Sequence, residues 1–191
     1  MNRHDQPYSP AALLGAAVRF TCEEYRQLRK HGLISEDTEL LDGLVIHKTR
    51  ETRVKASLLE TVVSRLEARG RDGMQFRYGQ TLRVGQSELR PDLAVIDGTD
   101  RVYRVNSPTT AFLIVEIGIV ADIDRSKAGV YASADVDEYW IIMPAEKIVE
   151  VYSRPGEKRY EQCQVYTEGQ SVHSATMPEI WMDSAALFEK L

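Results

Sequence analysis

The sequence predicts one α/β domain built on a mixed central β-sheet that is flanked by helices. The chain has 191 residues, a length that suits a single domain with a full hydrophobic core. Its segments follow the order helix, strands, helix, strands, helix, strands, which is typical of this class. Two of the strands, 93–96 and 112–115, are continuous apolar runs. Such runs indicate strands that are buried on both faces of a sheet.

Start signals and apolar spacing predict three helices. Thr21-Cys22-Glu23-Glu24 is a capping box, so a helix is expected from there to about Lys30, with Gly32 as its stop. A second helix is expected from Val54 to about Ala68, because apolar residues recur there along one face. These residues are Leu58, Leu59, Val62, Val63 and Leu66. A third helix should run from Asp124 to about Ala134 and lie on the sheet.

The remaining segments are expected to be strands. Residues 39–46 are typical of two short strands around the turn Asp42-Gly43. Residues 74–84 alternate roughly, a strand pair is expected at 138–143 and 148–152, and a last strand at 160–166. We divide the chain into an N-terminal extension, 1–18, and a single domain, 19–191. The apolar run 11–18 in the extension is interpreted as a short packing segment, and a signal-peptide core is the weaker alternative.

Composition limits the partners and the compartment. The net charge is −5, yet residues 48–90 carry ten basic and five acidic side chains, a local balance of +5. This segment can contact phosphates, although such runs are more often solvated surface. No apolar run approaches the ~20 residues that span a bilayer, so no membrane partner is expected. The two isolated cysteines, Cys22 and Cys163, favour the reducing cytoplasm.

Several common chemistries lack their motifs. The chain has no G-x-G-x-x-G after a strand, no P-loop and no G-x-S-x-G nucleophile turn. Its four histidines share no metal-ligand spacing.

An acidic set at strand ends remains as the candidate site. Asp92 precedes one apolar strand, and Glu116 ends the next. A carboxylate among apolar neighbours is costly unless it is paired, protonated, exposed or bound to a cation. Lys127 lies on the helix expected next and can reach the same place. Two carboxylates and an ammonium group can bind a hard divalent cation and orient a water. A plain Glu116–Lys127 ion pair that locks the helix to the sheet is the alternative.

These residues carry a resemblance. Pro91-Asp92, Glu116-Ile117-Gly118 and Lys127 resemble the PD-(D/E)XK nuclease signature, in the variant whose lysine lies on the following helix. From about Arg19 to Phe188 the chain resembles the bacterial Uma-type family, which is described as putative restriction endonucleases. The matching segments are 19–25, 39–43, 90–94, 112–116, Lys127 with 131–132, 138–142 and 178–188.

The resemblance implies a restriction-endonuclease-like core that hydrolyses DNA phosphodiester bonds with Mg²⁺ or Mn²⁺. Asp92, Glu116 and the backbone carbonyl of Ile117 would be the metal ligands. Lys127 would orient the attacking water, and Glu39 would hold a metal-bound water or help a second metal. The chain departs from the family pattern at three positions. They are Lys55 in place of a common histidine, Gly118, and Ile123 in place of an acid, with Asp122 and Asp124 on either side of it.

Basic residues near the start of the second helix are the first candidates for nucleic-acid contacts. They are Lys48, Arg50, Arg53 and Lys55. Such contacts position a backbone without reading its sequence. A homodimer would place two sites against two strands. Two alternatives stay open. One is a catalytically inactive nuclease-fold protein that binds nucleic acid or takes part in assembly, and the other is a metal-dependent phosphodiesterase acting on another substrate.

Overall fold

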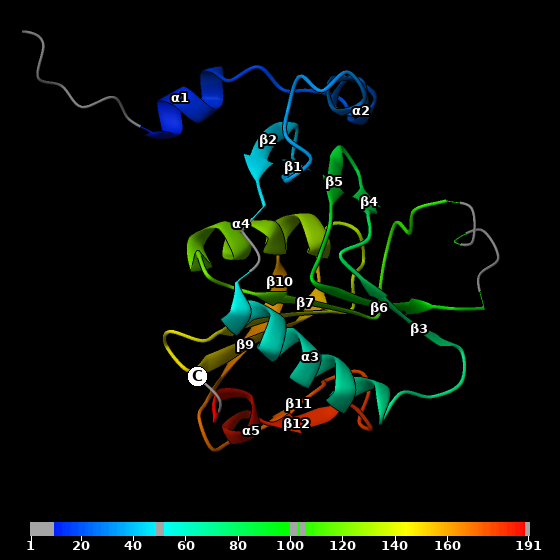
Figure 1. Ribbon diagram of the computed structural model, residues 1–191, viewed down its shortest axis with the longest axis vertical. Coiled ribbons are helices and arrows are strands. Elements are labelled where there is room, and N and C mark those ends of the chain that lie inside the picture. Colours follow the sequence, from blue (N-terminus) through cyan, green and yellow to red (C-terminus); the bar gives the residue numbers. More distant parts are fainter. Residues whose placement is uncertain (1–9, 49–51, 100–102, 104–105, 190–191) are drawn as a thin grey trace, which may run out of the picture.

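The centre of the molecule is a six-stranded mixed sheet with the strand order β10-β9-β8-β7-β6-β3 (Figure 1). The computed structural model describes residues 10–48, 52–99, 103 and 106–189. The strands are β3 (Met74–Tyr78), β6 (Leu93–Asp97), β7 (Leu113–Ile117), β8 (Glu138–Met143), β9 (Ile148–Pro155) and β10 (Tyr160–Thr167). Only β7 and β8 pair in parallel within this sheet as described. The predicted α/β class with a mixed sheet and flanking helices is confirmed.

Helices cover both faces of the sheet. On one face lie α3 (Arg53–Glu67), the hairpin of β11 (Ser171–His173) and β12 (Trp181–Asp183), and α5 (Ser184–Phe188). The other face is covered by α4 (Ala121–Ala132). Strands β6, β7 and β8 are therefore buried on both sides, which explains their continuous apolar sequences.

A second, four-stranded sheet with the order β2-β1-β5-β4 lies beyond α4 in Figure 1. Its strands are β1 (Thr38–Leu41), β2 (Leu44–His47), β4 (Leu82–Val84) and β5 (Ser87–Leu89). The helix α2 (Cys22–Lys30) packs against this second sheet. The buried hydroxyl of Tyr25 on α2 donates a hydrogen bond to the carbonyl of Thr38 on β1 at 2.7 Å. The short connection from β5 to β6 joins the two sheets and carries Asp92.

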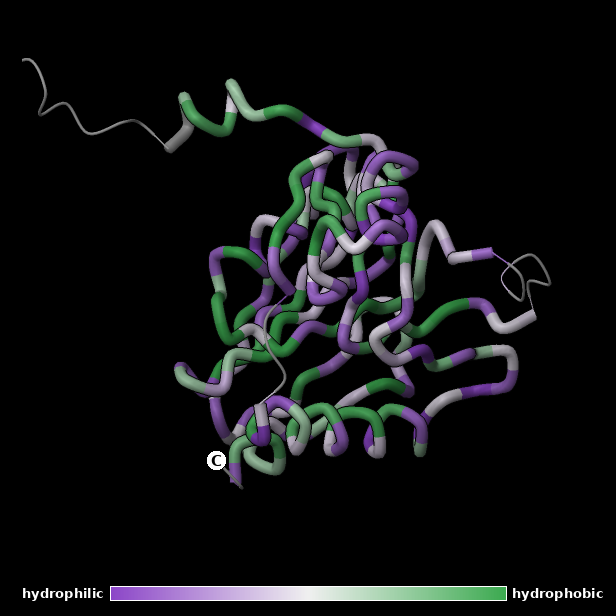
Figure 2. Tube along the Cα trace, turned by 45° about the horizontal axis from the view of Figure 1, so that its top comes forward, coloured by the Kyte–Doolittle hydropathy of each residue, from purple (hydrophilic) through white to green (hydrophobic). Residues whose placement is uncertain are grey.

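The N-terminal helix α1 (Pro10–Ala16) differs from its prediction. The sequence favours a packing segment, yet Leu13, Leu14 and Val18 are each more than half exposed. Figure 2 shows this partly hydrophobic segment extending away from the body of the molecule.

Most predicted elements are present, with shifted ends. The capping box at Thr21 forms with both of its hydrogen bonds. Helix α4 begins at Ala121, three residues before the predicted start, and the predicted strand 74–84 is divided into β3 and β4 at Gly79, which has a φ of +57°. Over the ranges described, the longest apolar helix falls short of what a bilayer crossing requires.

Candidate active site

The register of β6 and β7 brings Asp92 and Glu116 together. Leu93 pairs with Val115 in this antiparallel ladder, so the next pair along it is Asp92 and Glu116. The amide of Asp92 donates to Glu116 Oε2 at 3.4 Å, and the amide of Ile117 donates to Asp92 Oδ2 at 2.8 Å. Both carboxylates are almost completely buried, at 3% and 1% exposure. Two acids thus share one water-poor strand end.

Lys127 reaches the same place from α4. Its Nζ donates to Glu116 Oε1 at 2.8 Å and lies 3.0 Å from Glu39 Oε2. Glu39 sits on β1, and its other oxygen accepts the amide of Arg90 at 2.7 Å. The hydroxyl of Tyr131, one turn after Lys127, also donates to Glu116 Oε1 at 3.4 Å. The structure therefore brings together all four residues predicted as catalytic.

Two more lysines approach Asp92 from the other side. Lys55 on α3 is 2% exposed, and its Nζ lies 2.7 Å from Asp92 Oδ2. Lys48 follows β2, lies 3.5 Å from Asp92 Oδ1, and donates to the carbonyl of Arg90. The sequence interpretation of Lys55 as a surface phosphate contact does not fit this geometry, because its ammonium group is buried against Asp92.

The other predicted nucleic-acid contacts have different surroundings. Arg53 is exposed at the first turn of α3, and the side chain of Lys48 is 19% exposed. Arg50 lies outside the described residues. Lys48 and Arg53 thus remain candidates for contacts with a phosphate backbone.

Asp124 belongs to the cluster, although the sequence prediction did not include it. It is 3% exposed, and its Oδ1 lies 3.5 Å from Lys127 Nζ. Its Oδ2 is buried and has no hydrogen-bond partner among the residues that the structure describes. Residues three apart on a helix share a face, so the spacing of Asp124 and Lys127 was the available signal.

Burial and neighbouring charges raise the pKa of some acids in this cluster and lower the pKa of another. Burial raises the pKa of Asp92, and the charge of Glu116 raises it further against the effect of Lys55 and Lys48. Burial also acts to raise the pKa of Glu116, but the charges of Lys127, Lys48 and Lys55 together outweigh burial, so this pKa is lowered. Burial and then the charge of Glu116 raise the pKa of Asp124 to about 7. Unequal shifts of this kind assign different roles to neighbouring acids.

Lys127 is held in its charged form. Burial alone would lower its pKa, but the charges of Glu116, Glu39 and Asp124 outweigh burial and raise it. A lysine that stays protonated cannot accept a proton as a general base. It can only donate hydrogen bonds and stabilise negative charge.

Gly118 explains one departure from the nuclease signature. A Cβ atom at this position would lie 2.9 Å from Ile141 Cγ2 and 3.2 Å from Asp124 Oδ2. Real Cβ atoms do not approach neighbours so closely without a shift of the surroundings. The strand end has no room for a lysine at 118, and the ammonium group comes from α4 instead.

The carboxylates of the cluster could supply only part of the coordination shell of a hard divalent cation. Within the described ranges, no three Asp, Glu, His or Cys side chains are arranged to hold a metal ion by themselves. Asp92 and Glu116 nevertheless place two carboxylates side by side, and Mg²⁺ commonly uses one or two carboxylates and keeps several waters. The mutual repulsion that raises the pKa of Asp92 is the effect that a bound cation would relieve.

Comparison with known proteins identifies the family. The family model described as "Uma2: Putative restriction endonuclease" matches residues 22–185, most of the chain. The chain belongs to the Uma2 family. A solved structure similar to this Uma2 chain is "a putative nuclease belonging to DUF820" from Anabaena variabilis ATCC 29413, with a TM-score of 0.67 and 16% identity. The match covers 85% of this chain and 97% of that one, and it supports the fold. No curated protein matches the chain.

Proposed function

We propose that this Uma2 chain is a metal-dependent endonuclease that hydrolyses DNA phosphodiester bonds. The observation that carries the proposal is the buried group of Asp92, Glu116 and Lys127, in which two carboxylates adjoin and a permanently charged ammonium lies 2.8 Å from one of them. Membership of a family described as "Putative restriction endonuclease" supports nucleic-acid hydrolysis as the reaction.

Asp92 and Glu116 would hold Mg²⁺ or Mn²⁺, with the backbone carbonyl of Ile117 as a further oxygen ligand. When bound, the ion would lower the pKa of a water and neutralise charge on the attacked phosphate. The lowered pKa of Glu116 keeps this ligand ionised at neutral pH. Lys55 holds Asp92 Oδ2 and is itself a cation, so metal binding at Asp92 competes with that ion pair.

Lys127 would orient the attacking water and stabilise the anionic transition state. Removing one preorganised donor of this kind costs about 10²–10³ in rate at comparable sites. Glu39 touches Lys127 and is fixed by the amide of Arg90, so we assign it the positioning of Lys127. The role that the resemblance implies for Glu39, a contact with a metal-bound water or a second metal, is compatible with this position.

Arg53 and Lys48 are proposed to contact phosphates of the substrate. Such contacts fix the register of the nucleic acid and carry no sequence information. We propose a cytoplasmic location, on the basis of two cysteines that are both free.

One observation favours a second candidate, a nuclease-fold protein without catalytic activity. In the structure, Asp92 and Glu116 each already have a lysine ammonium within 2.8 Å. Such a network would also lock α3 and α4 to the sheet as a purely structural feature. Metal binding separates the two functions.

The decisive experiment is titration of Mg²⁺ and Mn²⁺ by calorimetry, with supercoiled-plasmid nicking on the same samples. The wild-type chain should bind metal and nick DNA, and Asp92→Asn should lose both. Asp122→Asn is the matched control, because this α4 carboxylate is 97% exposed and should behave as wild type. Parallel assays with RNA and a small phosphodiester test the other substrates. Absence of metal binding at millimolar concentration would refute the proposal.

A further inference from the structure

Strand β10 forms an uncovered edge of the central sheet. Of the strands that the structure describes, β9 alone pairs with it. Five consecutive residues, 161–165, are exposed. One row of backbone amide and carbonyl groups along this strand therefore faces outward, and such a row is a template for another strand.

The edge lacks the features that normally prevent strand addition. Natural edges are kept apart by lysines, prolines, bulges or very short strands. Here the exposed segment is Glu-Gln-Cys-Gln-Val, with one acid and no lysine or proline. Its pairing with β9 continues without a bulge from Gln162 to Thr167. Val165 is also 50% exposed.

We propose that β10 pairs with β10 of a second copy of this chain, antiparallel about a two-fold axis at Cys163. Opposed residues in a sheet point to the same face, so a two-fold axis normal to the sheet must place one residue opposite itself. With Cys163 on the axis, Gln162 lies opposite Gln164 of the second copy. Their amides offer both donors and acceptors, and they pair twice across the axis.

Charges at both ends of the strand are compatible with this register. Glu161 lies opposite the apolar Val165 of the second copy, so no like charges meet inside the strand. The turn before β10 carries Lys158 and Arg159, which outweigh Glu157, and all three are exposed. This turn comes next to Glu168 of the second copy, which follows β10 and already pairs with Lys147 of its own chain at 2.9 Å, so no like charge opposes the turn there.

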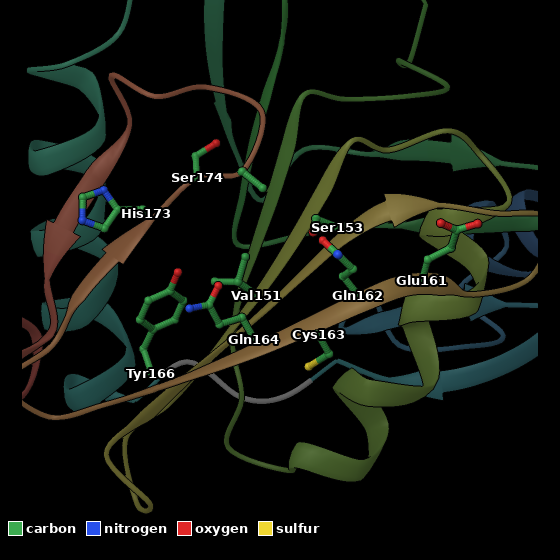
Figure 3. A pocket seen from close by; sticks show the side chains of 10 residues that line it. Val151, Ser153, Glu161, Gln162, Cys163, Gln164, Tyr166, His173 and Ser174 are labelled. Atoms are coloured by element: carbon green, nitrogen blue, oxygen red, sulfur yellow. The ribbon is translucent and has the colours of Figure 1, made fainter.

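The open pocket beside β10 adjoins the same interface. Its volume is about 540 Å³, and its lining combines β10 with the segment 173–175. Figure 3 shows Gln164 and Tyr166 directed to the side where His173 lies, while Cys163 points away from it. A two-fold axis normal to the sheet keeps the two pockets on one face, so they meet across the paired strands. The two Cys163 thiols meet on the opposite face.

The molecular mass in solution tests whether two copies of the chain associate. Light scattering on a sizing column at micromolar concentration should give about 43 kDa, twice the 21.6 kDa of one chain. A monomer of 21.6 kDa would overturn the proposal. Neither DNA nor metal enters this measurement, so its outcome is separate from that of the nuclease assay.

Charge variants at exposed positions of β10 test whether this strand forms the dimer interface. Gln162→Lys with Gln164→Lys places lysine opposite lysine twice, and the chain should become monomeric. The matched variant, Gln162→Lys with Gln164→Glu, places lysine opposite glutamate and should restore the dimer. A dimer that persists in the first variant would show that another surface is used and would refute the proposal.

Crosslinking tests the register. A short bis-maleimide should join two chains of Cys22→Ser through Cys163, and Cys163→Ser should stay uncrosslinked. A dimer of Cys22→Ser that resists crosslinking would refute the axis at Cys163.

Discussion

Replacing Lys127 by methionine tests whether its ion pairs hold the site together. The change keeps an unbranched side chain of similar length and removes an ammonium group that lies 2.8, 3.0 and 3.5 Å from Glu116, Glu39 and Asp124. These acids are between 0 and 3% exposed, so water cannot replace the lost partner. Removing one member of a buried pair costs about 3–5 kcal/mol. We expect a loss of that size in the free energy of unfolding at pH 8.

The loss of unfolding free energy in Lys127→Met should be smaller at acidic pH. In the wild-type chain the charges of Lys127, Lys48 and Lys55 together hold the pKa of Glu116 low, and Lys127 contributes the most of the three. Without Lys127 this pKa rises, so toward acidic pH the folded variant binds protons that the folded wild-type chain does not. Above the raised pKa the charged group destabilises the fold, and below it this penalty disappears. The deficit relative to wild type should therefore be smaller at pH 5 than at pH 8.

Urea denaturation followed by tryptophan fluorescence at the two pH values measures both effects. Lys147→Met is the control, because the ion pair of Lys147 with Glu168 is exposed, with side-chain exposures of 47% and 44%. It should cost no more than about 1 kcal/mol. A deficit for Lys127→Met as small as that of the control, or one that grows toward pH 5, would refute the reasoning.

Three further predictions follow from single sites. Gly118→Ala should lower the free energy of unfolding by about 1–3 kcal/mol, because its Cβ meets Ile141 Cγ2 at 2.9 Å. Gly15→Ala should cost nothing, because no described atom lies within 4 Å of a Cβ at that position. The pKa of Asp124, about 7, exceeds its unfolded value, so this group lowers the free energy of unfolding as the pH rises from about 4 to about 7. Asp124→Asn should remove that fall, and an unchanged difference in urea midpoint between pH 5 and 8 would contradict the assignment. Arg53→Gln should reduce the slope of log affinity for DNA against log salt by about 0.9, while Arg65→Gln farther along α3 should leave it unchanged.

Local sequence determined the elements that depend on neighbours along the chain. The capping box at Thr21 forms as predicted, because its two hydrogen bonds join residues three apart. The turn Asp42-Gly43 likewise takes the positive φ angles that such pairs favour. By contrast, the start of α4 was missed because its N-cap, Val120, makes no side-chain capping bond.

Elements that exist only through distant partners could not be predicted. The strands β5, β11 and β12 have three residues each and carry no recognisable period. They form because β1 and β4 border β5, and because β11 and β12 border each other. The exposure of α1 was missed for the same reason, since an apolar run shows what can be buried and not whether a surface is present to cover it.

For the candidate site too, the sequence predicted some features and the tertiary structure decided the others. Its motif residues Asp92, Glu116 and Lys127 were predicted because strand ends and helix spacing are visible in one dimension. Which carboxylate meets which ammonium was decided by the tertiary structure, because the β6–β7 register and the packing of α3 and α4 on opposite faces set those distances. Lys55 shows the difference most clearly. Its sequence neighbours are those of a surface lysine, and only the docking of α3 against the sheet buries its charge on Asp92.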